Sequence, residues 1–248
     1  MNIYLKDFFA QKYSNDTPGM GVIANQKGKI VFKDMIGLAN CEHKIPIDLD
    51  TVFNLASVSK QFTGMAILQL IEKGELHTSD KMTKYIPELR HYANDVTIYQ
   101  LVHHSSGLID YNELLWQKAR NNSLYSTNAE VLNLLRSEEH LCFIPGSKFD
   151  YSNSNYVMLA LIIERITGLT FRNYLKQYIF DVIGMQNTTV FNEEQPIISH
   201  RAYGYEKNGE QWKCFYVDTL ATGCANVFSS LSDLKKWDDA LYGDKLIR

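Results

Sequence analysis

Ser57 and Lys60 stand three residues apart in the tetrapeptide Ser57-Val58-Ser59-Lys60. Residues at this spacing share one face of a helix, so the amine of Lys60 can lie beside the hydroxyl of Ser57. A desolvated lysine can accept the proton of such a hydroxyl, which turns the serine into a nucleophile. A helix N-terminus at this point would also stabilise the developing alkoxide through its dipole and its free N–H groups. The pair therefore predicts acyl transfer to a serine.

The spacing alone is weak evidence, because 16 serines and 18 lysines in 248 residues give about one such pair by chance. A second pair exists at Ser232 and Lys235, and it is interpreted as helix surface. In isolation, Ser57 could be only the N-cap of a helix and Lys60 a solvated side chain. The assignment of a nucleophile therefore depends on what surrounds the pair.

Tyr151-Ser152-Asn153 is the second group of residues that could do chemistry. It follows a predicted turn at Pro145-Gly146 and precedes a strongly apolar segment that predicts a helix from about Ser154 to Thr167. Catalytic groups often lie in loops that a rigid element anchors. A tyrosine near a lysine can relay a proton to a leaving group, and an asparagine amide can orient a substrate and bond to the lysine. Without that context, Tyr151 and Asn153 would be ordinary loop and cap residues.

The hydrophobic pattern predicts the elements that would position these residues. Apolar residues recur at helical spacing from Ser57 to Lys73, and Gly74 is a natural end for that helix. The helix of residues 154–167 is apolar on nearly every side, which predicts that it lies in the middle of the molecule. Further predicted elements are helices at Asn128–Arg136, Phe171–Phe180 and Ser230–Tyr242, the last capped by Ser230, and hairpins at Met20–Ile36 and at Tyr203–Phe215 with a turn at Lys207-Asn208-Gly209.

Composition excludes several classes of function. The formal net charge is −3 and the pI is about 6.2, whereas a nucleic-acid-binding protein would need a basic excess. No apolar run is long enough to span a membrane, so no transmembrane segment is predicted. The first residues show no signal peptide, which predicts either a cytoplasmic protein or an exported one whose signal has been removed.

Neither the cysteines nor the histidines form a metal-binding pattern. The four cysteines lie far apart and are expected to be buried thiols. The adjacent His103 and His104 are interpreted as structural. No metal and no other cofactor is therefore expected.

Four segments carry a family resemblance: Phe53–Phe62, Leu101–Leu108, Pro145–Asn153 with the helix after it, and Asn226–Trp237. In this order they resemble motifs of the serine β-lactamase and penicillin-binding protein family. The resemblance is to its class C-like branch, which includes D-alanyl-D-alanine carboxypeptidase and esterase relatives. Each match alone is weak, but jointly they are specific. The resemblance implies Ser57 as the acylated nucleophile, Lys60 and Tyr151 as acid–base groups, and Asn153 as a positioning amide.

The resemblance also implies the fold class, α/β (α+β), in which an antiparallel sheet packs beside a helical region and the active site lies between them. It predicts a single domain over residues 1–248, with sheet at about 18–40 and 200–220 and helices at about 55–185. The family's third motif, K-T-G or H-T/S-G, is absent. Ala221-Thr222-Gly223 is the nearest tripeptide, but it precedes the segment that the motif should follow.

The C-terminal strands of the family are therefore expected to be lacking. One of the two N–H donors of an oxyanion hole would be lost with them, which costs about 2.7–4 kcal/mol in comparable acyl transfer. Three alternatives stay open: a fragment of a longer protein, a natural remnant, or a chain whose sheet is completed by another chain or in a homo-oligomer.

The activity implied is that of a serine hydrolase. Ser57 would be acylated by a β-lactam, a D-alanyl-D-alanine peptide or a small ester, and water would then release the acyl group. No residue distinguishes a β-lactamase from a D,D-peptidase or an esterase. The alternative is a penicillin-recognising or scaffold domain without turnover.

Overall fold

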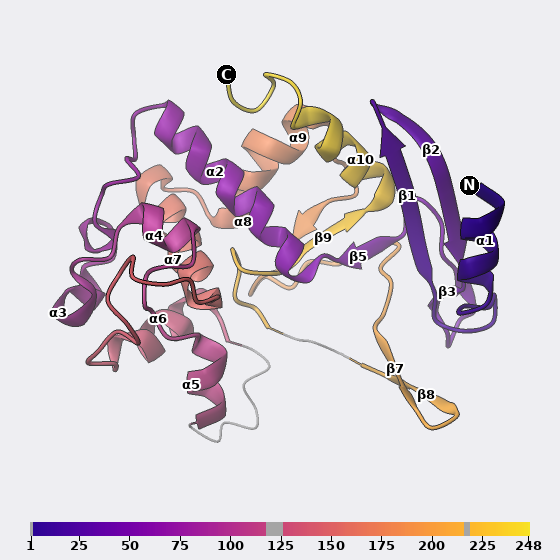
Figure 1. The fold of residues 1–248 in the computed structure, drawn as a ribbon, viewed down its shortest axis with the longest axis horizontal. Coiled ribbons are helices and arrows are strands. Elements are labelled where there is room, and N and C mark those ends of the chain that lie inside the picture. The colour runs from indigo at the N-terminus through magenta and orange to yellow at the C-terminus, as the bar shows by residue number, and fades with distance from the viewer. Residues whose placement is uncertain (1, 118–125, 216–218) are drawn as a thin grey trace.

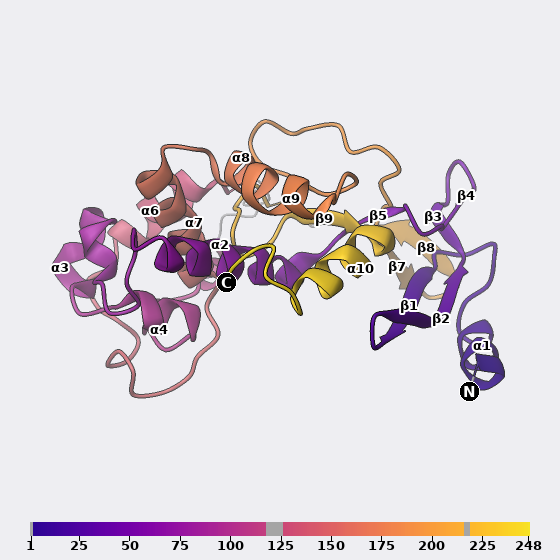
Figure 2. The same ribbon diagram turned by 90° about the horizontal axis from the view of Figure 1, so that it is seen from above.

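The computed structural model describes residues 2–117, 126–215 and 219–248. Figure 1 shows most helices gathered at one end of the molecule, a β-hairpin with a short N-terminal helix at the other, and a small sheet between them. Figure 2, seen from above, shows the same elongated arrangement. The predicted combination of helices with antiparallel sheet is confirmed. Residues 216–218 of the predicted sheet portion lie outside the described residues.

The N-terminal hairpin contains the two longest strands. Helix α1 (Asn2–Ala10) precedes β1 (Met20–Gln26) and β2 (Lys29–Ile36), and the two strands pair antiparallel as predicted. Lys27 and Gly28 form the turn with φ of 50° and 77°, the left-handed conformation that matches the twist of paired strands. Helix α1, which the sequence pattern does not predict, packs against β2.

Seven short strands form three further antiparallel sheets among the described residues. They pair as β3 (Leu38–Asn40) with β4 (Ile45–Pro46), β7 (Tyr205–Asn208) with β8 (Gln211–Cys214), and β5 (Val52–Asn54) and β6 (Thr189–Val190) with the two sides of β9 (Val227–Ser230). All four residues of β9 are buried, so this strand is the centre of the middle sheet. The predicted hairpin of residues 203–215 is confirmed, but its loop is Gly209-Glu210, because Asn208 still pairs with Gln211.

The helical end is built around α7 (Asn153–Thr167). The other helical elements are η1 (Ala56–Ser59), α2 (Lys60–Glu72), η2 (Met82–Lys84), η3 (Pro87–Leu89), α3 (Arg90–Ala93), α4 (Ile98–Val102), α5 (Tyr111–Gln117), α6 (Asn128–Arg136), α8 (Phe171–Leu175), η5 (Lys176–Phe180), α9 (Asp181–Ile183) and α10 (Leu231–Ala240). Nine of the fifteen residues of α7 are buried, and α2, α4, α6 and α8 all contact it, as its apolar sequence predicts. Among the described helices, none is long and apolar enough to cross a bilayer.

The helix predictions hold for the long elements and differ at their ends. The predicted helix of residues 57–73 begins with the 3₁₀ turn η1 before α2 proper. The predicted helix of residues 171–180 is α8 followed by the π-helical turn η5. Ser230 caps α10, since its hydroxyl accepts a backbone N–H of the first turn at 3.3 Å.

The expectation of four buried thiols is wrong. Cys224 is buried and Cys41 is partly exposed, whereas Cys142 and Cys214 are exposed. Cys214 is exposed because it lies on β8, in a hairpin that projects from the body of the molecule (Figure 1).

Gly223 tests how tightly the loop before β9 packs on α7. A Cβ at this position would lie 2.3 Å from the carbonyl oxygen of Tyr156, and the φ of Gly223 is 86°. Gly168 has a similar φ, 70°, but open space at its Cβ position, so it is a matched control. We expect Gly168→Ala to cost about 1–2 kcal/mol, the cost of a left-handed backbone. Gly223→Ala should cost about 1–3 kcal/mol more, because its Cβ meets helix backbone.

Urea unfolding followed by circular dichroism measures both free energies of unfolding. Equal losses in the two variants would contradict the close packing of this loop on α7.

Candidate active site

A sharp turn presents Ser57 at the start of η1. Strand β5 ends at Asn54, and Ala56 then takes a φ of 45°, which is uncommon for a residue other than glycine. The side-chain oxygen of Asn54 accepts the Ala56 N–H at 2.8 Å and stabilises this turn. Ser57 is exposed, so a substrate can reach its hydroxyl.

Strand β9 fixes the position of the turn. The Leu55 N–H donates to the carbonyl of Val227 at 2.9 Å, and the Val227 N–H donates to the hydroxyl of Ser59 at 3.0 Å. These bonds hold the chain on both sides of Ser57. The start of the helical segment therefore cannot shift without breaking contacts to the middle sheet.

The amine of Lys60 reaches the Ser57 hydroxyl, at 3.3 Å, as the spacing predicts. Its Nζ also donates to Asn153 Oδ1 at 2.8 Å and to the carbonyl of Cys224 at 2.7 Å. Lys60 is only 8% exposed, so these acceptors replace the water that the amine loses on burial. The two shorter bonds occupy two N–H groups, and the third direction of the nitrogen faces Ser57. This arrangement suits an amine that exchanges a proton with the serine.

Tyr151 completes the surroundings of the Ser57 hydroxyl. Its phenol donates to Ser57 Oγ at 2.8 Å, and Lys60 Nζ lies 4.8 Å from the centre of its ring. Tyr151 is 44% exposed, which places it on the solvent side of the buried lysine. The hydroxyl thus lies between an amine and a phenol and is open to solvent.

A second tyrosine, Tyr156 on α7, lies near the site but is engaged elsewhere. Its hydroxyl donates to the carbonyl of Val102 at 3.1 Å, and burial raises the pKa of its phenol. Lys60 Nζ is 5.5 Å from the centre of its ring. Tyr151 is therefore the phenol that is placed for proton transfer with Ser57.

Asp110 sets the orientation of Asn153, the first residue of α7. Its Oδ2 accepts the Asn153 backbone N–H at 2.7 Å and the side-chain Nδ2 at 2.8 Å. Because Nδ2 is held there, Oδ1 of Asn153 is left to face Lys60. A carboxylate thus positions the amide that positions the lysine.

The structure brings Ser57, Lys60, Tyr151 and Asn153 together through the contacts given above. It does not join the residues of the second Ser-x-x-Lys tetrapeptide. The hydroxyl of Ser232 donates to Asp50 at 2.6 Å, and Lys235 pairs with Asp239 on the next turn of α10.

The tripeptide Ala221-Thr222-Gly223 lies in a buried loop and not on a strand. Thr222 bonds to the side chain of Asn128 on α6, and the Gly223 carbonyl accepts the hydroxyl of Thr63 at 2.7 Å. This position differs from the strand on which the family's third motif is expected.

Sequence reasoning missed two contributors to the site: Asp110 and the Cys224 carbonyl. Asp110 follows the segment Leu101–Leu108 by two positions, and that proximity is the one signal that could have indicated it. A backbone carbonyl carries no signal in the sequence. In the part of the chain that the structure describes, no group of three or more His, Cys, Asp or Glu side chains could hold a metal ion.

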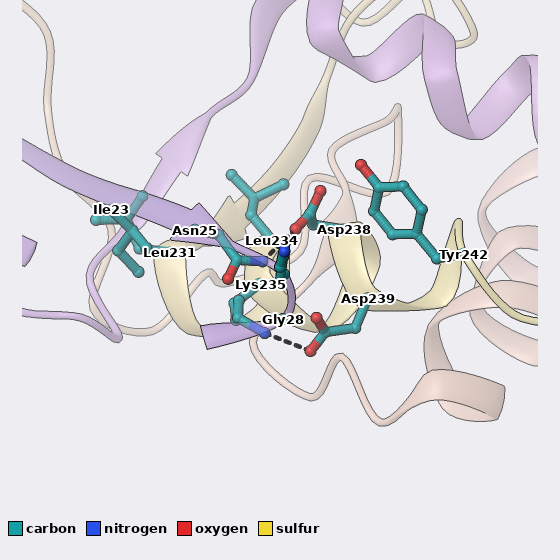
Figure 3. A pocket seen from close by; sticks show the side chains of 10 residues that line it. Ile23, Asn25, Gly28, Leu231, Leu234, Lys235, Asp238, Asp239 and Tyr242 are labelled. Atoms are coloured by element: carbon teal, nitrogen blue, oxygen red, sulfur yellow. Dashed lines mark hydrogen bonds and ion pairs between the residues drawn. The ribbon is translucent and has the colours of Figure 1, made fainter. Parts of the chain in front are cut away.

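A cavity of about 840 Å³ lies away from this site, between β1 and α10 (Figure 3). Its lining includes Ile23 and Leu234, and Asn25 donates to Asp238 across it at 2.5 Å. None of the four predicted site residues lines it. We place the candidate site at Ser57, because acyl transfer needs a nucleophile in contact with acid–base groups. Those contacts are found at Ser57, and a large cavity volume does not replace them.

Comparison with known proteins agrees with this fold. A sequence model of the family described as Beta-lactamase matches residues 5–247. Penicillin-binding protein 4* of Bacillus subtilis (strain 168) is 33% identical over 241 residues, covering 91% of this chain and 52% of the relative. The octameric penicillin-binding protein homologue from Pyrococcus abyssi is similar in structure, with a TM-score of 0.83 and 26% identity, over 99% of this chain and 56% of that one.

The D-amino acid amidase from Ochrobactrum anthropi SV3, solved with L-phenylalanine, shares the fold at 21% identity, with a TM-score of 0.75 over 92% of this chain and 66% of that one. The chain spans about half the length of the curated relatives that it matches. Since the family match extends over nearly every residue and the fold is that of the penicillin-binding serine hydrolases, this chain belongs to the beta-lactamase family.

Proposed function

We propose that this chain carries the acylation site of a serine hydrolase, with Ser57 as nucleophile, Lys60 and Tyr151 as acid–base groups and Asn153 as a positioning amide. The observation that carries the proposal is the pair of contacts at Ser57 Oγ, 3.3 Å from Lys60 Nζ and 2.8 Å from the Tyr151 hydroxyl. An exposed serine between a buried amine and a phenol has a partner for each proton transfer in acyl transfer.

In the proposed reaction, Lys60 Nζ accepts the proton of Ser57 as Oγ bonds to the carbonyl carbon of the substrate. The N–H of Ser57, in the first turn of the helical segment, donates to the oxygen that becomes negative. Tyr151 gives its proton to the leaving nitrogen or oxygen as the bond to the carbonyl carbon breaks, and the proton held by Lys60 returns to Tyr151. Water then attacks the acyl-serine with the same groups in reversed roles and releases the acid.

The proposed substrates are a β-lactam, a D-alanyl-D-alanine peptide or a small ester. The names of similar proteins, a penicillin-binding protein and a D-amino acid amidase, support an acyl compound of this kind. The alternative is a penicillin-recognising domain that is acylated without turnover. Steady release of hydrolysed product favours the hydrolase, and an adduct that persists favours the alternative.

We also propose that a second copy of this chain completes the sheet at β1. Among the described residues, β1 pairs only with β2, so its other edge has no strand partner, and a cavity lined by apolar and charged side chains lies between β1 and α10. The octameric state of the Pyrococcus abyssi homologue supports assembly from like copies. Light scattering of the purified chain should give the mass of an oligomer, whereas the mass of a monomer would contradict the proposal.

Ser57→Ala is expected to abolish covalent labelling by a reactive penicillin, because it removes the hydroxyl held between Lys60 and Tyr151. The matched control is Ser232→Ala, in the second tetrapeptide, which should label like the parent protein. Intact-protein mass spectrometry measures the adduct, and circular dichroism verifies the fold. An adduct on the Ser57→Ala protein would refute the assignment.

Lys60→Ala should slow acylation about 10²–10⁴-fold, the usual contribution of a positioned acid–base group. Lys235→Ala, which alters the second tetrapeptide and the lining of the large cavity, should change the rate by no more than about twofold. Stopped-flow acylation by a chromogenic penicillin gives both rates. Similar losses in the two variants would mean that the wrong tetrapeptide has been assigned.

A further inference from the structure

We propose that His104 is a positioning residue for Tyr151, and that it makes the acylation of Ser57 sensitive to acid. The inference rests on the proposed function, because it concerns the state in which Tyr151 can serve Ser57. It is carried by the contacts of one buried imidazole with the segment that presents the tyrosine.

His104 bonds to both chain neighbours of Tyr151. Its carbonyl accepts the N–H of Asp150 at 2.8 Å, and its ring Nδ1 accepts the N–H of Ser152 at 3.2 Å. The backbone of His104 has a φ of 54°, and this left-handed conformation accompanies its unusual pair of contacts. One residue therefore fixes the backbone on either side of the phenol.

The imidazole also supports the phenol ring itself. The rings of His104 and Tyr151 stack with centroids 4.4 Å apart and planes at 26°. The ring of Tyr156 stacks on His104 as well, at 5.1 Å and 30°. His104 is 8% exposed, so these rings and the backbone hold it in one place. A shift of the imidazole would therefore displace the Tyr151 hydroxyl from Ser57.

The contacts at Nδ1 require a neutral imidazole with its proton on Nε2. Nδ1 accepts the Ser152 N–H, and the Asn155 amide nitrogen lies 3.4 Å from the same atom. The other end of that amide, Oδ1, accepts the hydroxyl of Ser106 at 2.6 Å, which directs its NH₂ group toward His104. A proton on Nδ1 would meet two donors and break both contacts.

The charges around His104 also oppose its protonation. Burial lowers the pKa of His104 first, and the nearby Lys60 lowers it further; the carboxylate of Asp110 acts to raise it, and His103 lowers it. The rings packed on the imidazole are those of Tyr151, Tyr156 and Phe149. Because the net shift is downward from 6.5, His104 is neutral at pH 7 and gains its proton only at a lower pH than an ordinary histidine.

Protonation of His104 in acid would release the Ser152 N–H and place a positive charge near Lys60. The segment that carries Tyr151 would loosen, and the phenol would leave Ser57 Oγ.

The lowered pKa of His104 also determines how the stability of the folded state changes with pH. The unfolded chain binds this proton first as the pH falls below 6.5, so the folded state loses stability between there and the lower pKa of the native protein.

The geometry can be tested without any activity. In protein labelled with ¹⁵N at histidine, we expect NMR to show His104 as the neutral Nε2–H tautomer, which gains its proton at a lower pH than an ordinary histidine. An Nδ1–H tautomer, or a His104 whose pKa is 6.5 or higher, would overturn the proposal. The NMR result does not depend on acylation. If the parent protein is never acylated, the proposed function is contradicted, but the proposed state of His104 is not.

The effect on Tyr151 is tested by the pH dependence of acylation in two variants. His104→Asn keeps an acceptor for the Ser152 N–H and a residue that tolerates a left-handed backbone, but it cannot titrate. For each protein we take the ratio of the acylation rate at about pH 5 to the rate at pH 7. This ratio should be higher for His104→Asn than for the parent protein. His104→Phe keeps a ring for stacking but no acceptor, and it should lose about fivefold or more at every pH, the effect of one lost hydrogen bond.

His103→Asn is the matched control, because the ring of His103 is exposed and its one hydrogen bond within the described residues is to the carbonyl of Tyr99, at 2.8 Å. It should keep the rate of the parent protein at pH 7 and, because His103 is the smallest of the influences on the pKa of His104, change the pH profile less than His104→Asn does. A merely structural role for His104 would lower the amount of folded protein and leave the pH profile unchanged. That outcome, in His104→Asn protein whose fold is verified by circular dichroism, would overturn the proposal.

Discussion

The buried amine of Lys60 is the contact on which the candidate site depends. Its three acceptors come from the start of the helical segment, the first residue of α7 and the loop before β9, and they lie up to 164 residues from Lys60 in sequence. A lysine that is 8% exposed has lost most of its water, and leaving such a group without partners costs several kcal/mol. The fold must therefore bring these three segments together at one point.

Much of the surrounding structure serves that requirement. The side chain of Asn226 donates to the carbonyls of Thr219 and Ala221, at 2.6 and 3.0 Å, and so shapes the loop that offers Cys224. Burial raises the pKa of the Cys224 thiol to about 11, so this side chain stays neutral beside Lys60 while the Cys224 carbonyl accepts a hydrogen bond from the amine. Asp110 holds the amide of Asn153 in the orientation that Lys60 needs. The site is thus a set of loops tied to α7 and β9.

The longer helices, the two hairpins and the closeness of Ser57 to Lys60 could be predicted because their signals are local. An apolar run indicated α7, an Asn25–Gly28 turn indicated the first hairpin, and residue spacing indicated that Ser57 and Lys60 share a face. What could not be predicted depends on contacts between distant segments. The left-handed Ala56 is held by sheet contacts on both sides, the Cys224 acceptor is a backbone group, and His104 acts on residues almost fifty positions away. The prediction that the cysteines are buried was wrong for a related reason. Cys214 is exposed on a projecting hairpin, and composition carries no signal of such exposure.

The most direct test of the central claim is to incubate the parent protein with a reactive penicillin and locate the adduct by intact mass and peptide mapping. The account predicts one covalent adduct, on Ser57, because only that hydroxyl is bonded to both Lys60 and Tyr151 within the described residues. An adduct on any other residue would contradict it, and so would a folded protein that remains unmodified.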